Sequence, residues 1–145
     1  TEEGLADWQY SIKIEHGLQP VELPNTGLII EAGIVGRDKF LLHVREPGWV
    51  FVGLKNEDVI CDIRNRRPGD RIILEHGTVK IKDYFNQKKL DIRERDGVPL
   101  LIIGGRIAAV MAGLSGHGGN RVADGYMVRE DSEKIFALHS TGGLY

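Results

Sequence analysis

The sequence has a single cysteine, Cys61, among its 145 residues. One thiol cannot form an intramolecular disulfide, so a disulfide-stapled fold and a zinc site built from several cysteines are both excluded. Long apolar runs are also missing. The longest, residues 107–114, contains a glycine and falls short of the roughly 18 residues that a transmembrane helix needs. We therefore expect no membrane span.

The beginning of the sequence lacks the features of a targeting segment. Its first four residues include two glutamates, where a secretory signal peptide has a basic region. It also lacks an initiator Met, so we expect a fragment or a processed chain. Together with the single thiol, these features fit a reducing compartment, and we expect a cytoplasmic protein.

The net charge is small, but the charges are unevenly distributed. Nineteen basic and twenty-one acidic residues give −2, which excludes a uniformly basic, histone-like protein. Residues 64–95 nevertheless carry a charge of +5, and the remainder carries −7. A basic patch on an acidic body favours a specific anionic partner over general stickiness. The ten basic residues of the patch are Arg64, Arg66, Arg67, Arg71, Lys80, Lys82, Lys88, Lys89, Arg93 and Arg95.

Most of the hydrophobic pattern is typical of short β-strands. Alternation and short apolar runs predict strands at residues 8–15, 28–35, 40–44, 49–54, 59–64, 100–103, 106–111, 125–129 and 135–139. A hairpin turn is expected at residues 36–38. The two-residue loop Gly104-Gly105 predicts a type I′ turn, because both of its positions require a positive φ.

Helical spacing occurs in one part of the basic segment. Ile81, Tyr84 and Phe85 form an apolar stripe, and Lys88 can lay its stem along it. Asp91 and Glu94 have the spacing of an N-cap and its partner, which predicts a second, one-turn helix. The expected class is α+β, mostly antiparallel β with one clear helix and one short helix. We expect a β-rich lead-in at 1–56 and a basic α+β domain at 57–145, or one unit.

A glycine-rich loop at residues 113–120 is the first candidate for chemistry. It lacks the closing Gly-Lys-Ser/Thr of a phosphate-binding P-loop and the glycine spacing of a dinucleotide site. Its Gly113-Leu-Ser-Gly116 stretch matches the loop of a KH domain, but it lies between predicted strands instead of helices. Ser115 and His117 leave open a small enzyme at this loop. A mobile connector is the simpler interpretation.

Four arginines flank one predicted tight turn at residues 64–71. Pro68 presets φ and Gly69 accepts a positive φ, which suits a type II turn. Guanidinium groups match phosphate oxygens in a planar fork, and a rigid turn fixes their directions. Asp70 can brace one arginine. These features favour binding of a folded or helical RNA, and a solvated charged face is the alternative.

The order of motifs resembles the C-terminal domain of bacterial tRNA(Ile)-lysidine synthetase. The resemblance rests on residues 64–72, 80–85, 89–96 and 98–101, on Gly105-Arg-Ile107 with Val110, and on residues 112–114. Residues 128–135 look like the end of that family, and residues 5–58 look like the stretch that precedes its C-terminal domain. The resemblance extends over most of the chain.

The resemblance implies a role in tRNA recognition. The family's enzyme uses ATP, with magnesium, to activate the wobble cytidine of an isoleucine tRNA that has a CAU anticodon, and then joins lysine to it. Its ATP-binding loop is absent here, so the resemblance implies a non-catalytic part with no cofactor of its own. By the family's motifs, the ten basic residues named above would bind the tRNA acceptor stem.

Two alternatives belong to other functional classes. The acidic body and the strand edges favour a protein-interaction module, with the parent's own catalytic domain as a possible partner. A small enzyme at Ser115 and His117 is the second alternative. The five histidines show no metal-ligand spacing, so we expect no metal site.

Overall fold

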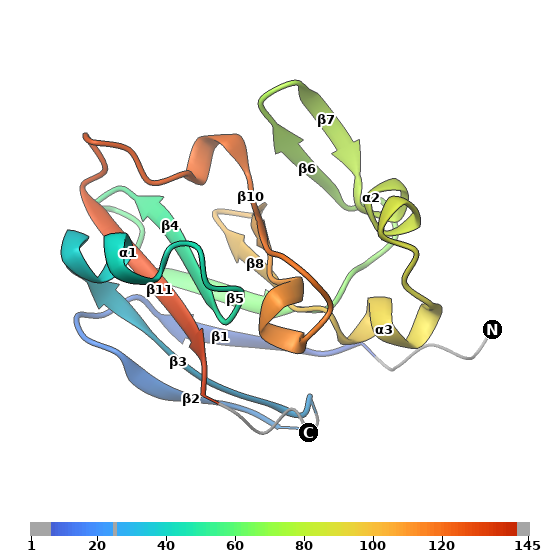
Figure 1. Ribbon diagram of the computed structural model, residues 1–145, viewed down its shortest axis with the longest axis horizontal. Helices are drawn as coiled ribbons and strands as arrows, with labels where there is room; N and C mark the ends of the chain where they lie inside the picture. The colour runs from blue at the N-terminus through green and yellow to red at the C-terminus, as the bar shows by residue number, and fades with distance from the viewer. Residues whose placement is uncertain (1–6, 25, 142–145) are drawn as a thin grey trace.

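The computed structural model describes residues 7–24 and 26–141, and its strands form two sheets and a separate hairpin (Figure 1). The five-stranded sheet has the order β1 (Gln9–Lys13), β5 (Ile60–Arg64), β8 (Leu100–Ile103), β9 (Arg106–Val110) and β10 (Arg121–Val122). The four-stranded sheet has the order β2 (Gln19–Leu23), β3 (Leu28–Val35), β11 (Lys134–Ser140) and β4 (Trp49–Leu54). The separate hairpin consists of β6 (Arg71–Leu74) and β7 (Gly77–Lys80). All these strand pairs are antiparallel.

The main hydrophobic core lies between the two large sheets. Ile63 and Leu101 of the five-stranded sheet share one buried cluster with Val52 and Phe136 of the four-stranded sheet. Both sheets take strands from either side of residue 56, because β1 pairs with β5 and β11 lies between β3 and β4. Side chains alternate between the faces of a strand, so each sheet also has an outer face to cover.

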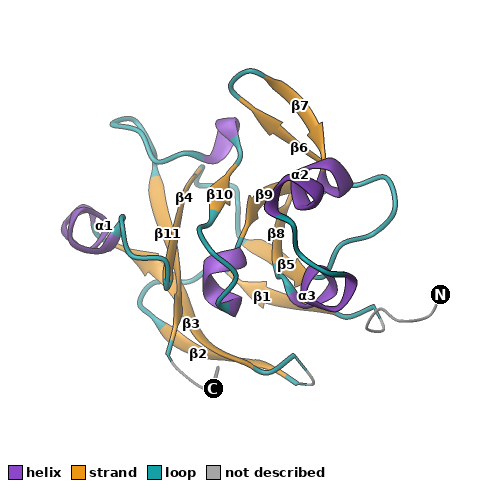
Figure 2. Cartoon of the chain, turned by 45° about the vertical axis from the view of Figure 1, so that its right-hand side comes forward, coloured by secondary structure: helices purple, strands orange, loops and turns teal. Residues whose placement is uncertain are grey.

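Helices cover the two outer faces, on opposite sides of the molecule (Figure 2). On the five-stranded sheet, Leu100 and Val110 pack in a second cluster with Ile81 and Phe85 of α2 (Ile81–Lys88). The short helix α3 (Ile92–Gly97) follows α2. On the four-stranded sheet, α1 (Arg37–His43) packs Phe40 against Phe51, with 5.4 Å between the ring centroids. Buried Tyr84 and Phe85 thus belong to the core, as the helical stripe indicates.

Local sequence signals are confirmed where turn or cap chemistry is specific. Gly104 and Gly105 have φ values of 59° and 78°, as a type I′ hairpin requires. Asp91 accepts a hydrogen bond from the Glu94 backbone N–H at 2.9 Å, and the Glu94 side chain accepts one from the Asp91 N–H, also at 2.9 Å. This capping box begins α3. The α+β class, dominated by antiparallel strands, is confirmed.

The strand expected at residues 40–44 and the turn expected at 36–38 are wrong. Those residues form α1, with Gly36 in the extended conformation at its N-cap. Three consecutive apolar side chains, residues 40–42, do not distinguish a strand from a helix by periodicity. The helix buries Phe40 against the sheet and leaves Leu41 and Leu42 largely exposed.

The strand expected at residues 125–129 is also wrong. This segment contains the end of a short 3₁₀ helix, η2 (Asp124–Tyr126), and pairs with no strand among the described residues. Tyr126 instead packs against both large core clusters, and its hydroxyl donates to the Ile103 carbonyl at 3.2 Å. The expected glycine-rich loop contains a second such helix, η1 (Ala112–Ser115). Strands β2, β6, β7 and β10 were not predicted. In the described ranges, no helix has the length and apolar character needed to cross a membrane.

Candidate nucleic-acid interface

The arginine-rich segment forms a tight turn between β5 and β6. The Asp70 backbone N–H donates to the Arg67 carbonyl at 3.1 Å, which closes a four-residue turn with Pro68 and Gly69 at its centre. Gly69 has a φ of +86°, the left-handed value that the type II prediction requires. The turn therefore has the conformation that its proline and glycine favour.

Asp70 organises this turn from within. Its carboxylate accepts two hydrogen bonds from the Arg64 guanidinium, at 2.8 and 2.9 Å, and one from the Arg67 backbone N–H at 2.7 Å. The side chains of Arg64 and Asp70 are only 13% and 12% exposed. Arg64 is thus neutralised and enclosed, and it braces the turn instead of facing solvent.

Arg66 is held by a second acidic residue from a distant part of the chain. Its Nε donates to an Asp96 carboxylate oxygen at 2.7 Å. The Asp96 carbonyl accepts from the Trp8 indole N–H at 3.3 Å, and the backbones of Trp8 and buried Asn65 are also joined. The beginning of β1, the turn and α3 are therefore linked in one network.

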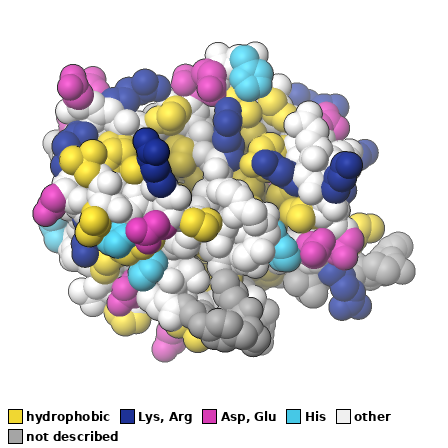
Figure 3. Space-filling model, viewed as in Figure 1, with side chains coloured by type: hydrophobic (Ala, Val, Ile, Leu, Met, Phe, Trp, Pro, Cys, Tyr) yellow, Lys and Arg dark blue, Asp and Glu magenta, His cyan; other side chains and the backbone are white. Residues whose placement is uncertain are grey.

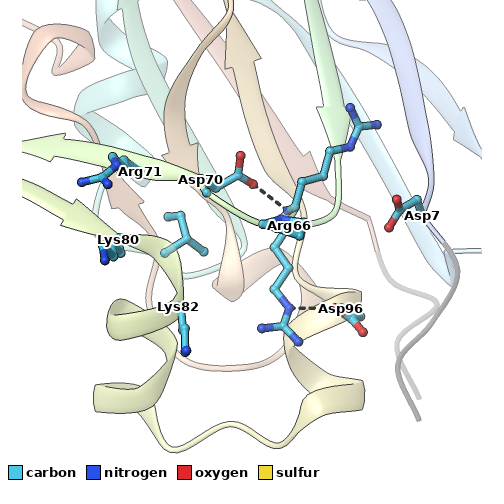
Figure 4. A pocket seen from close by; sticks show the side chains of 11 residues that line it. Asp7, Arg66, Asp70, Arg71, Lys80, Lys82 and Asp96 are labelled. Carbon is cyan, nitrogen blue, oxygen red and sulfur yellow. Dashed lines mark hydrogen bonds and ion pairs between the residues drawn. The ribbon is translucent and has the colours of Figure 1, made fainter. Parts of the chain in front are cut away.

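A groove of about 570 Å³ opens beside this turn (Figure 4). Arg71, Lys80 and Lys82 lie on one side of it, and Arg66 and Asp96 face them. The start of α2 is tied to the turn, because the Ile81 N–H donates to the Asp70 carbonyl at 2.9 Å. The structure thus brings together five of the ten predicted site residues: Arg66, Arg67, Arg71, Lys80 and Lys82.

Four of these cations form no ion pair among the described residues: Arg71, Lys80, Lys82 and Arg67, whose guanidinium donates to the Gln9 side chain. Arg71 and Lys80 are also directly paired across the β6–β7 ladder. Like charges in opposed positions of a ladder destabilise the pair unless an anion neutralises them. Lys and Arg side chains gather on the part of the surface that carries β6, β7 and α2 (Figure 3). This arrangement is suited to binding phosphate groups.

The remaining predicted residues do not line the groove. Arg64 lies behind the turn, and the other four lie along α2, α3 and their connection. Arg95 donates to the Leu90 carbonyl at 2.6 Å and to the Asn86 side chain at 2.9 Å, so it holds this connection together. Lys88 sits over the Tyr84 ring, 5.4 Å from its centroid. Lys89 and Arg93 are exposed.

The glycine-rich loop does not assemble a nucleophile. Ser115 donates its hydroxyl hydrogen to the Ala112 carbonyl at 3.1 Å, while the His117 ring faces Glu94 at 3.8 Å. Burial, reinforced by the charge of Asp62, raises the pKa of the Cys61 thiol to about 12, so this thiol stays protonated. Over residues 7–24 and 26–141, no three His, Cys, Asp or Glu side chains are grouped as a metal site would require.

Sequence reasoning missed the acidic part of the groove. Asp7 and Asp96 line it, and Asp96 is buried, with only 9% of its surface exposed. Asp96 directly follows the last basic block, but no spacing rule connects it with Arg66, thirty residues earlier. Only the fold shows that the two are partners.

Residues 61–125 match the family model described as the TilS substrate C-terminal domain. Over 82 residues, which are 52% of this chain and 20% of the relative, the chain is 33% identical to a tRNA(Ile)-lysidine synthase of Thermotoga sp. (strain RQ2). It is 27% identical to the enzyme of Clostridioides difficile (strain 630) over 114 residues, which are 77% of this chain and 22% of the relative. The chain thus spans about a fifth of the length of the curated relatives it matches.

The fold has a counterpart among solved structures. A crystal structure of a TILS C-terminal domain superposes with a TM-score of 0.63 at 23% identity, covering 93% of this chain and 99% of the other. The matched segment contains the turn, the β6–β7 hairpin, α2 and α3. The resemblance carried by the sequence motifs is therefore confirmed.

Proposed function

We propose that this chain, with its TilS substrate C-terminal domain, is the tRNA-recognition region of a tRNA(Ile)-lysidine synthase. The observation that carries this proposal is the groove beside the arginine turn. There, Arg71, Lys80 and Lys82 face open space without acidic partners in the described part of the chain. The substrate region is the acceptor stem of an isoleucine tRNA with a CAU anticodon.

The shape of the groove supports binding of a helical RNA by its backbone. Side chains cannot read the deep major groove of A-form RNA, so proteins recognise such helices through phosphates, 2′-hydroxyls and shape. Arg71 offers a planar fork, while Lys80 and Lys82 offer point charges from a fixed helix start. The cations therefore suit successive phosphates along one strand.

The rest of the reaction belongs to the parent enzyme. We assign ATP, magnesium and lysine to its catalytic domain, which would activate the wobble cytidine and form the new C–N bond. This region would contribute binding energy and tRNA choice, and the parent would work in the cytoplasm. Exposed Lys89 and Arg93 extend the positive surface beyond the groove.

The test is tRNA binding by this chain across a salt series. We expect tight binding to the isoleucine tRNA that weakens steeply with salt, because phosphate contacts release counterions. The triple variant Arg71→Ala, Lys80→Ala and Lys82→Ala should flatten the slope of log K against log salt by up to about three units. Lys39→Ala, an exposed lysine on α1, is the matched control.

Two outcomes decide the proposal. Elongator methionine tRNA measures selectivity, and weaker binding of it supports tRNA choice by this region. If the triple variant binds isoleucine tRNA as tightly as the Lys39→Ala control, the groove is not the tRNA site.

A docking function has one specific observation in its favour. Helix α1 exposes Leu41 and Leu42 at 70% and 71%, and Val44 behind it at 43%, at the end of the molecule away from the groove (Figure 2). This surface would suit the parent's own catalytic domain. The double variant Leu41→Ser and Leu42→Ser should weaken association of the two separately produced parts without changing tRNA affinity. Equal association would contradict docking through α1.

A further inference from the structure

A second groove, of about 600 Å³, lies on the other side of the arginine turn and β6. Its walls come from β6, β7, the β8–β9 turn and η2. Of the ten predicted site residues, only Arg64 and Arg71 of the arginine turn line this groove. The turn separates the two grooves, since Gly69, Asp70 and Arg71 line both of them.

The charge of this second groove depends on two arginines. Arg64 and Asp70 neutralise each other, and Asp124 is paired with Arg129. That leaves Arg71 and Arg106, which have no acidic partner in the described ranges. They come from β6 and β9, so two separate elements present guanidinium groups to one groove.

The second groove also contains apolar side chains beside its arginines. Ile73 is 51% exposed on β6, and Ile107, Ala123 and Tyr126 line the same space. The Tyr126 hydroxyl is bound to a backbone carbonyl, which fixes the ring. Hydrophobic side chains are visible among the Lys and Arg side chains on this part of the surface (Figure 3). Guanidinium and aromatic planes beside apolar surface are typical of sites for unstacked bases.

We propose that the second groove binds unpaired nucleotides at the end of the RNA helix that the first groove holds. Arg71 would contact the backbone where the helix ends, and Arg106 would contact the next phosphates. The bases would lie against Ile73 and Tyr126. This inference rests on the proposed function, because the helix must occupy the first groove for its end to reach the second.

The experiment compares a blunt RNA duplex with the same duplex carrying a short single-stranded extension, on the 3′ end in one probe and on the 5′ end in another. We expect at least one extension to raise the affinity by about tenfold, the scale of one stacked base. Arg106→Ala and Ile73→Thr should each remove most of this gain and leave blunt-duplex affinity unchanged. Both positions are exposed, and threonine keeps the β-branched shape that suits a strand.

Lys82→Ala, in the first groove, should have the opposite effect to Arg106→Ala. It should weaken the blunt and extended duplexes equally, so the ratio of their affinities stays that of the parent chain. Arg45→Ala, at an exposed arginine after α1, is the matched control for Arg106→Ala and should change neither affinity. Thermal melting of each variant checks that it is folded.

The outcomes separate the two proposals. If the duplex binds but neither extension raises the affinity, the proposal for the second groove is wrong and the proposed function still holds. An Arg106→Ala variant that weakens blunt and extended duplexes equally also overturns it. Failure of both RNAs to bind overturns the proposed function, and the inference falls with it.

Discussion

Two arginines flank the turn at residues 67–70, and the fold uses them in different ways. Arg64, before the turn, is enclosed and forms two hydrogen bonds with Asp70. Arg71, after the turn, is exposed and faces Lys80 across a ladder without an acidic partner in the described chain. Arg64 therefore stabilises the conformation of the turn, whereas Arg71 is free to bind an anion. Basic residues a few positions apart can thus divide into supports and contacts.

The largest effect should come from breaking the supporting side. Asp70→Ala leaves the mostly buried Arg64 charge without its partner and also frees the Arg67 N–H. We expect a loss of about 3 kcal/mol in the free energy of unfolding, because an unpaired buried charge is costly. Urea unfolding measures it. A loss below about 0.5 kcal/mol, the range of ordinary surface substitutions, would show that the pair supports nothing.

Cys61 offers a local reporter of the same effect. It is buried on β5, near Arg64, and its raised pKa keeps it protonated at neutral pH. A thiol reagent can therefore label it only after β5 opens. If opening follows global stability, a loss of about 3 kcal/mol should speed labelling by roughly 100-fold in Asp70→Ala. The Arg71→Ala variant should be labelled at the parent rate. Faster labelling of this variant would show that Arg71 also stabilises the fold, which would contradict the different roles of Arg64 and Arg71.

Substitution of Arg71 and Lys80 should change tRNA affinity but not the free energy of unfolding. Arg71→Ala with Lys80→Ala removes two like charges that face each other, so the free energy of unfolding should stay within about 0.5 kcal/mol of the parent value. The salt slope of tRNA binding should flatten by about two units. Paired urea and binding measurements check both statements. A stability loss as large as that of Asp70→Ala would contradict the division of roles.

The smallest effect is expected at Lys88, on the same helix as Lys82 but outside the groove. Its ammonium lies over the Tyr84 ring, and such exposed cation–π contacts contribute about 0.5 kcal/mol. Lys88→Ala should therefore cost about that much stability and leave groove-dependent tRNA affinity nearly unchanged. Lys82→Ala, with the same loss of charge, should do the reverse. Equal binding losses would extend the interface along α2.

The sequence predicts the parts of this structure that local chemistry determines. The Gly104-Gly105 hairpin, the Asp91 cap of α3 and the turn before β6 each follow from residues that tolerate one conformation best. Helix α1 was missed because three adjacent apolar residues suit a strand as well as a helix. The partner of Arg66 was missed because it lies thirty residues away. Tertiary packing decides which arginines stabilise the turn and which are free to bind a ligand. No rule of sequence spacing predicts this difference.

The position of β11 bears on how the chain is made. It is the last described strand, yet it lies between β3 and β4, and its Ile135 pairs with Val35. As the ribosome produces the chain from its N-terminus, β3 emerges with one edge unpaired in the sheet and β4 with both edges unpaired. The edges that pair with β11 stay open until residue 140 has left the exit tunnel. Such distant pairing slows folding, and open edges invite association with other chains.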